Sequence, residues 1–411
     1  MNNFEEQCTS FVQSIGNKKG AISTQITSSA SFSYGSPETA EGIFNGSVKE
    51  PLYSRMGNPT TTKLESILAD MDGGIGAVAT SSGMAATTLA TMSLLSAGDE
   101  IISIGGLFGG TYSLFNETLS RFGIKTLFFD VDEFENIKNS ITENTKIIFL
   151  ESVGNPNMKL PNIPKIATIA DEAGVALIVD NTITPLSISP LKMGADIVVY
   201  STTKVIAGNS SALGGCAVFR AINDGKDKFK TQRYSFLTKF IKGVGSMALI
   251  PNAKKRALRD MGMSANAHAS YQTLLGLETL PLRLPRIVNS IEIIVQELTK
   301  NGLIINHPSL SNHPHYMLYT TDFKNGCGTL FTIDMGSKEK AFSFLKKTKL
   351  AFITANIGDS RTLALHMAST IYSDFNDKEK EFLGITDGLI RISIGLENPQ
   401  DIITDFLNAA K

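Results

Sequence analysis

The sequence predicts an α/β protein built on a mostly parallel sheet. Two patterns indicate this fold class: short, nearly continuous runs of Val, Ile and Leu recur between residues 77 and 221, and segments with helical periodicity separate them. Hydrophobic residues make up 42% of the 411 residues, which is enough to form a large core. In open sheets of this kind ligands bind beyond the carboxyl ends of the strands, so the polar residues at those ends are the candidates for a site.

The predicted elements follow one another along the chain. Apolar strands are expected in seven segments, at residues 77–82, 99–106, 124–131, 145–152, 175–181, 196–204 and 214–221. A long helical stretch is expected at 270–302, and strands and helices alternate after it. The last helix is expected to begin at Asn398, whose side chain can cap it, with Pro399 in the first turn and Asp401 near the positive end of the helix dipole.

These patterns divide the chain into an N-terminal arm (1–50), a large domain (51–255) and a smaller C-terminal α/β domain (256–411). The arm is rich in Ser, Thr, Asn and Gly and has weak periodicity, so we expect an extended segment. A floppy tail and an arm packed on a partner subunit both fit this composition. The basic segment 224–243 is interpreted as a solvated helical face rather than as a nucleic-acid patch.

Charge and cysteine content argue against several classes of function. Lys and Arg total 38 and Asp and Glu total 39, so a net charge of −1 gives no general attraction to nucleic acid or to an anionic membrane. The three cysteines are scattered, and His313 and His315 have no cysteine or carboxylate near them in the sequence, so we expect neither disulfides nor a metal site. No apolar window is long enough to span a bilayer, and the first residues do not resemble a signal peptide. We therefore expect a cytoplasmic protein with no nucleic-acid or membrane partner.

Three segments carry residues with chemical potential. The stretch SSGMAA (81–86) joins a strand to a helix, where Ser82 and the glycine after it would expose backbone N–H groups to an anion. Asp180 ends a fully apolar strand, so its carboxylate is either a strand-end cap or the partner of a cationic ring nitrogen. Lys204 follows the next strand and is either a surface lysine or one whose lowered pKa suits a Schiff base.

Together these residues predict a site for pyridoxal 5′-phosphate (PLP). Asp180 suits the pyridinium nitrogen of this cofactor, and Lys204 suits its aldehyde. Ser201 and Thr203 lie two residues apart, so their hydroxyl groups can reach the phosphate from one side of the turn.

The chain also resembles the family of PLP-dependent enzymes of cysteine and methionine metabolism. The similar segments appear in family order and cover nearly the whole chain from residue 50: YSRMGNPTTTKLE (53–65), SSGMAA (81–86), LFGGTY (107–112), ESVGNP (151–156), VDNT (179–182), STTK (201–204), GLETLPLR (276–283), NIGDSRTL (356–363) and RISIGLEN (391–398). The resemblance implies a fold-type-I PLP-dependent transferase fold, with a large domain, a smaller C-terminal domain and homotetramers made of dimers that share active sites.

The resemblance also implies roles for individual residues. Lys204 would carry the cofactor, Asp180 would hold its ring nitrogen protonated, and Phe108 would stack on the ring as the third residue of the catalytic group. The remaining cofactor contacts are implied for Gly83 and Met84 through backbone N–H groups, Ser82, Ser201 and Thr203 near the phosphate, Asn155 beside the phenolic oxygen, and Tyr53 and Arg55 reaching the phosphate of the neighbouring subunit.

Arg391 has an independent argument. In LIRISIG the isoleucines at 390, 392 and 394 point to one face of a strand, so Arg391 points to the other. By itself this pattern also fits an ordinary solvent-facing arginine. Together with the resemblance, Arg391 is expected to bind the substrate α-carboxylate as a bidentate fork, with Asn356 lining the same pocket.

The sequence departs from the family pattern at four places. Phe108 stands where most members have a tyrosine, Tyr200 where they have a histidine, and Gly110 where methionine γ-lyases have a cysteine. The segment HMASTIYSD (366–374) lacks the frequent Thr-His pair. Without the phenol at 108, a leaving group that needs little acid help is favoured.

These features predict a γ-replacement enzyme that converts O-acetylhomoserine and sulfide, or another thiol, into homocysteine or methionine and acetate. The alternatives are a methionine γ-lyase and a cystathionine γ-synthase or lyase. A non-catalytic PLP-binding protein is disfavoured because Lys204, Asp180 and Arg391 are all retained. The acyl group of the substrate and the sulfur donor stay open, and the donor alternatives include a protein-borne persulfide or thiocarboxylate.

Overall fold

The computed structural model describes residues 4–411, and the side chains from residue 8 onward. A seven-stranded sheet has the order β1-β7-β6-β5-β4-β2-β3. Its strands are β1 (Gly76–Thr80), β2 (Glu100–Ile104), β3 (Lys125–Phe129), β4 (Thr145–Glu151), β5 (Ala176–Asp180), β6 (Ile197–Tyr200) and β7 (Gly215–Phe219). Six of the seven lie within the predicted segments, and β1 begins one residue before its segment, at Gly76. Their mostly parallel arrangement is confirmed, because only β7 runs against its neighbours.

Apolar side chains cover both faces of this sheet, as the continuous hydrophobic runs require. One face packs with α3 (Pro59–Asp72), α7 (Ile163–Glu172) and the first half of the long α11 (Ala267–Lys300). The other face packs with α4 (Gly83–Met92), α5 (Gly109–Ser113) and α9 (Leu249–Ala253). Because β4, β5 and β6 are parallel, their carboxyl ends meet at one edge of the sheet.

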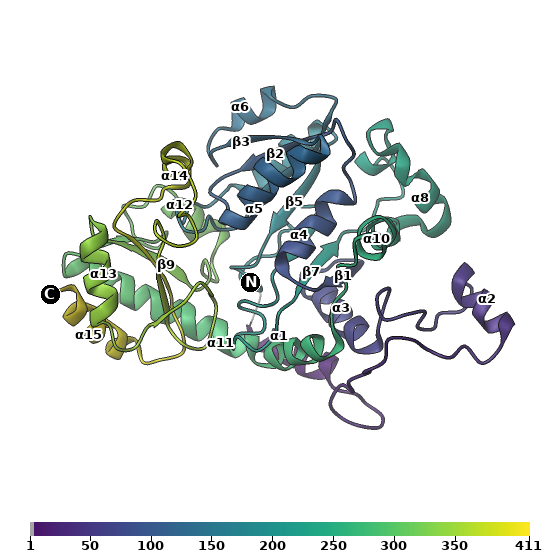
Figure 1. The fold of residues 1–411 in the computed structure, drawn as a ribbon, viewed down its shortest axis with the longest axis horizontal. Helices are drawn as coiled ribbons and strands as arrows, with labels where there is room; N and C mark the ends of the chain where they lie inside the picture. The colour runs from purple at the N-terminus through teal and green to yellow at the C-terminus, as the bar shows by residue number, and fades with distance from the viewer. Residues whose placement is uncertain (1–3) are drawn as a thin grey trace.

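A second sheet of five strands forms the C-terminal part, on the left in Figure 1. Its order is β10-β11-β12-β9-β8, from β8 (Ile304–Asn306), β9 (Leu330–Asp334), β10 (Phe352–Ile353), β11 (Leu363–His366) and β12 (Leu389–Ser393). The helices α13 (Lys338–Lys347), α15 (Pro399–Ala410) and the end of α11 cover it with a separate apolar core. Asn398 caps α15 by accepting a hydrogen bond from the Gln400 amide at 2.9 Å, as predicted.

The helix α11 joins the two parts, and it belongs to both cores. Leu277 and Leu284 in its first half pack in the core of the large sheet, whereas Ile291 and Leu298 in its second half pack in the core of the small sheet. The domain boundaries at residues 50 and 255 therefore stay a prediction.

The expectation of an extended N-terminal arm is wrong for two segments, α1 (Phe4–Ile15) and α2 (Pro37–Asn45). Phe11 and Ile15 lie one helical turn apart and are buried in the core of the large sheet. This packing fixes α1 against the large sheet of the same chain. Ser36 caps α2, and Gly46 ends it in a left-handed conformation with φ of 84°. Figure 1 shows α2 lying away from both sheets, at the end of an extended connection.

Shorter helices complete the chain. They are α6 (Phe134–Asn139), α8 (Thr238–Val244), α10 (Arg259–Met261), α12 (Tyr316–Asp322) and α14 (Asp377–Leu383), with 3-10 or π turns at Leu114–Thr118, Leu119–Phe122, Lys228–Lys230, Gln232–Leu237, Gly245–Met247 and Lys254–Leu258. Within residues 4–411, no helix combines the length and the apolar character needed to cross a membrane.

The histidine pair near residue 314 is less isolated than the sequence indicated. The His315 Nε2 atom lies 3.1 Å from Asp132 Oδ2, and the loop that carries Asp132 is remote in sequence, so a carboxylate is present after all. The His315 Nδ1 atom accepts a hydrogen bond from the Leu160 amide. In the described part of the chain, no three His, Cys, Asp or Glu side chains gather as a metal site would require.

Candidate active site

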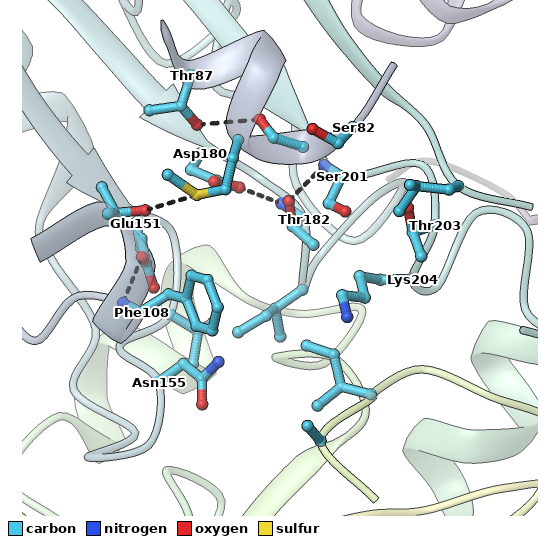
Figure 2. A pocket seen from close by; sticks show the side chains of 18 of the residues that line it. Ser82, Thr87, Phe108, Glu151, Asn155, Asp180, Thr182, Ser201, Thr203 and Lys204 are labelled. Atoms are coloured by element: carbon cyan, nitrogen blue, oxygen red, sulfur yellow. Dashed lines mark hydrogen bonds between the residues drawn. The ribbon is translucent and has the colours of Figure 1, made fainter. Parts of the chain in front are cut away.

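A pocket opens at the carboxyl ends of β4, β5 and β6, where the large sheet faces the C-terminal part. Figure 2 shows its side chains converging from these strand ends and from the start of α4. It is lined by Ser82, Gly83, Met84, Thr87, Phe108, Thr111, Glu151, Val153, Asn155, Asp180, Thr182, Ile183, Ser201, Thr203, Lys204, Leu213, Ala355, Ile357 and Arg391. The structure therefore brings together every predicted site residue except Tyr53, Arg55 and Asn356, and Asn356 contacts the pocket through Lys204.

One end of the pocket is a cup with hydrogen-bond donors. The Ser82 hydroxyl accepts from the Ala85 amide at 3.1 Å and caps α4, so the N–H groups of Gly83 and Met84 stay without partners inside the helix. A Cβ atom on Gly83 would lie 2.5 Å from the Ser201 Cβ, so only glycine lets the helix approach Ser201 this closely. Amide donors at a positive helix end, together with the hydroxyls of Ser201 and Thr203, suit a phosphate.

Lys204 has the electrostatic environment of a reactive amine. Burial, and then the nearby positive charge of Arg391, lower the pKa of Lys204 from 10.5 to about 8. Its Nζ donates to Asn356 Oδ1 at 2.7 Å, and Asn356 Nδ2 donates to the Ser210 hydroxyl at 2.9 Å. The amine is thus held at a defined place, and its uncharged fraction near neutral pH is far larger than that of an ordinary lysine.

Arg391 lies on β12 and faces the pocket, while Ile390 and Ile392 face the core of the small sheet, as the alternating pattern predicted. Its guanidinium donates to Asn155 Oδ1 and to the Ala355 carbonyl, both at 3.1 Å. Burial lowers the pKa of Arg391 to about 10, and no carboxylate among the described residues pairs with it. A buried guanidinium that bonds only neutral oxygens is a site for a carboxylate ligand.

Asp180 is a buried carboxyl group that has no cationic partner among the described residues. Its Oδ1 accepts from the Thr182 amide at 2.9 Å, and burial is the first cause that raises the pKa of its carboxyl. None of the ion pairs formed by the described residues includes it. A buried carboxylate without a cation is costly, so this position is suited to a ligand that brings a positive charge.

Two residues that sequence reasoning missed also shape the pocket. Thr182 accepts a hydrogen bond from the Ser201 amide at 2.8 Å, which ties the loop after β5 to the turn after β6. Glu151 ends β4 and stands in register with Asp180 on β5. Glu151 could have been found by the rule that singled out Asp180, because it also follows a continuous apolar strand.

Tyr53 and Arg55 lie outside this pocket. Arg55 Nη1 donates to the Arg259 carbonyl at 2.6 Å, and its guanidinium stands 5.7 Å from the centre of the Tyr53 ring. Both side chains are exposed at the surface of this chain. Neither residue lines the pocket of its own chain.

The tyrosines nearest in sequence to the site do not face the pocket. The Tyr200 hydroxyl donates to Asp72 Oδ2 at 2.7 Å, behind the sheet, and the Tyr112 hydroxyl approaches Glu379 at 3.4 Å. Neither tyrosine nor histidine is among the residues that line the pocket. A Cβ atom on Gly110 would lie 2.7 Å from the Phe108 ring, so the glycine at 110 makes room for that ring.

The pocket fits PLP in four independent ways. The cup suits the phosphate, Lys204 suits the aldehyde, and the uncompensated carboxyl of Asp180 suits a pyridinium nitrogen. Phe108 offers an apolar ring at the pocket wall (Figure 2). The fold and the pocket together define a PLP-dependent α/β enzyme.

Comparisons with known proteins give the family. A profile described as Cys/Met metabolism PLP-dependent enzyme matches residues 8–411. The chain is 36% identical to an O-acetyl-L-homoserine sulfhydrylase of Leptospira meyeri, covering 88% of this chain and 86% of that protein. It is 33% identical to an L-methionine γ-lyase of Fusobacterium nucleatum, covering 95% and 93%. The chain belongs to the family of Cys/Met-metabolism PLP-dependent enzymes.

A solved structure agrees with this assignment. The crystal structure of a putative O-acetylhomoserine (thiol)-lyase from Campylobacter jejuni matches with a TM-score of 0.94 at 31% identity, covering 98% of this chain and 99% of that one. That protein carries a pyridoxyl-lysine phosphate residue. The predicted fold type and the predicted cofactor are thus confirmed.

Proposed function

We propose that the enzyme replaces the acetoxy group of O-acetylhomoserine with sulfide or another thiol. When bound, PLP supplies the electron sink that stabilises negative charge on the substrate carbon next to the amine. The observation that carries the choice of leaving group is the absence of tyrosine and histidine from the described pocket lining. Acetate leaves as a weakly basic anion and needs little protonation, whereas a thiolate is a stronger base.

The chain's own residues can bind the substrate and move its protons. We assign the substrate α-carboxylate to Arg391, whose guanidinium lies buried without an anionic partner. Lys204, once free, would carry protons at the α and β carbons, and its pKa of about 8 suits both removing and returning a proton near neutral pH. Asn356 would hold the amine between these transfers, as its hydrogen bond to Nζ suggests.

The charge of the pocket supports an acetyl group over a succinyl or phosphoryl group. Lys204 and Arg391 are the only cationic side chains among its described lining residues, and both already have a role. A second carboxylate or a phosphate on the substrate would therefore lack a partner from this chain. The sulfur donor is proposed to be free sulfide or a small thiol, with a protein-borne donor as the alternative.

We expect the enzyme to form homocysteine from O-acetylhomoserine and sulfide at least about tenfold more efficiently than it forms α-ketobutyrate from methionine, since losing a positioned acid costs at least 1.4 kcal/mol of barrier. The measurement is kcat/KM for both reactions on one preparation. O-succinylhomoserine and cystathionine serve as controls. A faster reaction with methionine would favour a γ-lyase, the activity for which the Fusobacterium relative is named.

We also propose that the enzyme is a homotetramer in which two subunits share each active site. We propose further that it is a cytoplasmic enzyme. The surface position of Tyr53 and Arg55 in this chain supports the sharing, because the residues implied to bind the phosphate cannot reach their own pocket. The three cysteines are free, as is usual in a reducing compartment.

Subunit mixing tests the shared site. An Arg55→Ala protein and a Lys204→Ala protein should each be impaired, and their mixture should regain up to about a quarter of wild-type activity after subunit exchange, because one site type per mixed dimer is intact. The activity of mixed samples is compared with that of unmixed ones. Proven mixed dimers with no recovered activity would contradict a shared site.

A further inference from the structure

The position of the Phe108 ring depends on its backbone. A phenylalanine ring carries no hydrogen-bonding atom, so it cannot be tethered at its far end as a tyrosine can. Phe108 precedes α5 and has φ of −53° and ψ of 133°, so it stands just outside the helix, where no helical hydrogen bond engages its amide. Another group must hold this amide if the ring is to keep one orientation.

Glu151 supplies that group. Its Oε1 atom accepts a hydrogen bond from the Phe108 amide at 2.7 Å, across 43 residues of sequence. Glu151 is the last residue of β4, so it is part of the rigid sheet, whereas Phe108 belongs to the connection between β2 and α5. The contact therefore anchors a loop to the sheet edge that carries Asp180.

The surroundings of Glu151 favour its neutral form. The groups that face its carboxyl are the Phe108 amide, the carboxyl of Asp180 from the neighbouring strand and, farther away, the phenol of Tyr372. No cation from the described residues pairs with it. Burial first, and the charge of Asp180 second, raise the pKa of Glu151 well above its usual value. Two adjacent buried carboxyls do not both ionise, and Asp180 is the one that meets the cationic ligand.

Tyr372 holds the same loop from the other side. Its hydroxyl lies 3.0 Å from the Asn155 carbonyl and 3.4 Å from the Leu107 carbonyl, and it is the only hydrogen donor of the three groups. A Cβ atom on Gly109 would lie 3.2 Å from the Tyr372 ring, so this ring rests directly on the backbone next to Phe108. The segment 366–374, which departs from the family pattern, thus contacts the backbone of the pocket wall through a buried phenol, although Tyr372 itself does not line the pocket.

We propose that Glu151, as a neutral carboxylic acid, and Tyr372 are positioning residues that clamp the Leu107–Gly109 backbone and thereby orient the Phe108 ring against the cofactor. In this arrangement Asp180 keeps the only negative charge at the floor of the site. The proposal rests on the PLP site and not on the choice of substrate.

The first test measures hydrogen exchange of the Phe108 amide in the apoprotein, together with visible circular dichroism of the bound cofactor. Glu151→Ala should speed the exchange about tenfold or more, the equivalent of one lost hydrogen bond, and should reduce the dichroic band. Glu151→Gln keeps an acceptor oxygen and should leave both readouts near wild type. Tyr372→Phe should weaken the dichroic band while KM for the amino acid changes less than kcat.

Glu100→Ala is the matched control, because Glu100 is a buried carboxyl at the opposite end of the same sheet. It should leave the exchange of the Phe108 amide unchanged. Unchanged exchange and dichroism in Glu151→Ala would overturn the clamp. If Glu151→Gln changes the amide exchange and the dichroic band as much as Glu151→Ala does, the proposal that Glu151 is neutral is overturned. Amide exchange and the dichroic band of the bound cofactor do not involve the substrate, so a failure in these two readouts is distinct from a failure of the sulfhydrylase assignment.

A second test addresses the charge of Glu151 and also applies if Glu151→Ala does not fold. The unfolded chain releases the Glu151 proton at an ordinary pKa while the folded chain keeps it, so this group lowers the stability of the apoprotein as pH rises between the two pKa values. Glu151→Gln removes this loss. The thermal midpoint of Glu151→Gln minus that of the wild type should therefore become larger as the pH is raised from about 6 to about 8. A difference that does not change with pH would show an ionised Glu151 and overturn the proposal.

Discussion

Lys204→Ala should lose nearly all γ-replacement activity, by a factor of about 10⁴ or more, because one amine both carries the cofactor and moves the substrate protons. The pocket offers no second lysine among its described lining residues, so no other side chain can take over these roles. The measurement is steady-state turnover with saturating cofactor, combined with borohydride reduction and peptide mapping. The wild-type protein should carry the reduced cofactor on the peptide that contains Lys204.

Lys242→Ala is a suitable control, because Lys242 lies in the last turn of α8 and is not one of the residues that line the pocket. A borohydride-stable adduct that persists in Lys204→Ala would contradict the assignment. The pH dependence gives an additional readout, since only the uncharged amine attacks an aldehyde. Uptake of PLP by the apoprotein should therefore become faster as pH rises, with a midpoint of about 8, the lowered pKa of Lys204, and not near 10.5.

Asp180→Asn should weaken PLP binding and slow α-proton exchange by about 10²- to 10⁴-fold, because removing one partner of a buried charge pair costs about 3–5 kcal/mol. The Asn side chain has nearly the same shape, and its oxygen can still accept from the Thr182 amide. The effect therefore isolates the negative charge. The measurements are the dissociation constant of PLP, from fluorescence titration, and the exchange of the α-proton into deuterated solvent.

Asp72→Asn is the matched control for this substitution. Asp72 is also a fully buried aspartate with a raised pKa, about 7, but it lies behind the sheet on Tyr200 and does not line the pocket. It should change stability more than cofactor affinity. Normal α-proton exchange in Asp180→Asn would show that this carboxylate only caps its strand, which is the simpler of the two interpretations that the sequence allowed.

The strands and the candidate residues that line the pocket at their ends could be predicted because their signals are local. The run VALIVD shows both a buried strand and the charged residue at its end, and the turn after DIVVY carries Lys204 in the same way. The alternation around Arg391 places its side chain opposite the isoleucines without any knowledge of the partner strands. These features depend on the period of the backbone and on the cost of burying a charge.

Other features depend on contacts between segments that are distant in sequence, and the tertiary structure decided them. The bond from Lys204 to Asn356 spans 152 residues, and the approach of Tyr372 to Asn155 spans 217. Composition indicated an extended arm, but the packing of Phe11 and Ile15 on the large core makes its first segment a helix. Packing against a distant surface overrides a weak local preference, because the burial of apolar side chains contributes more than intrinsic helix propensity.

The sequence by itself therefore determined the fold class, the cofactor and the positions of Lys204, Asp180 and Arg391 as candidate site residues. Only the tertiary structure decided the charge state of Glu151 and the orientation of Phe108. Both result from two neighbouring strands ending at the same edge in register, which places Glu151 beside Asp180 and within 2.7 Å of the Phe108 amide. A pKa and a ring position depend on every group within a few ångströms, and those neighbours come from segments whose proximity no local pattern in the chain reveals.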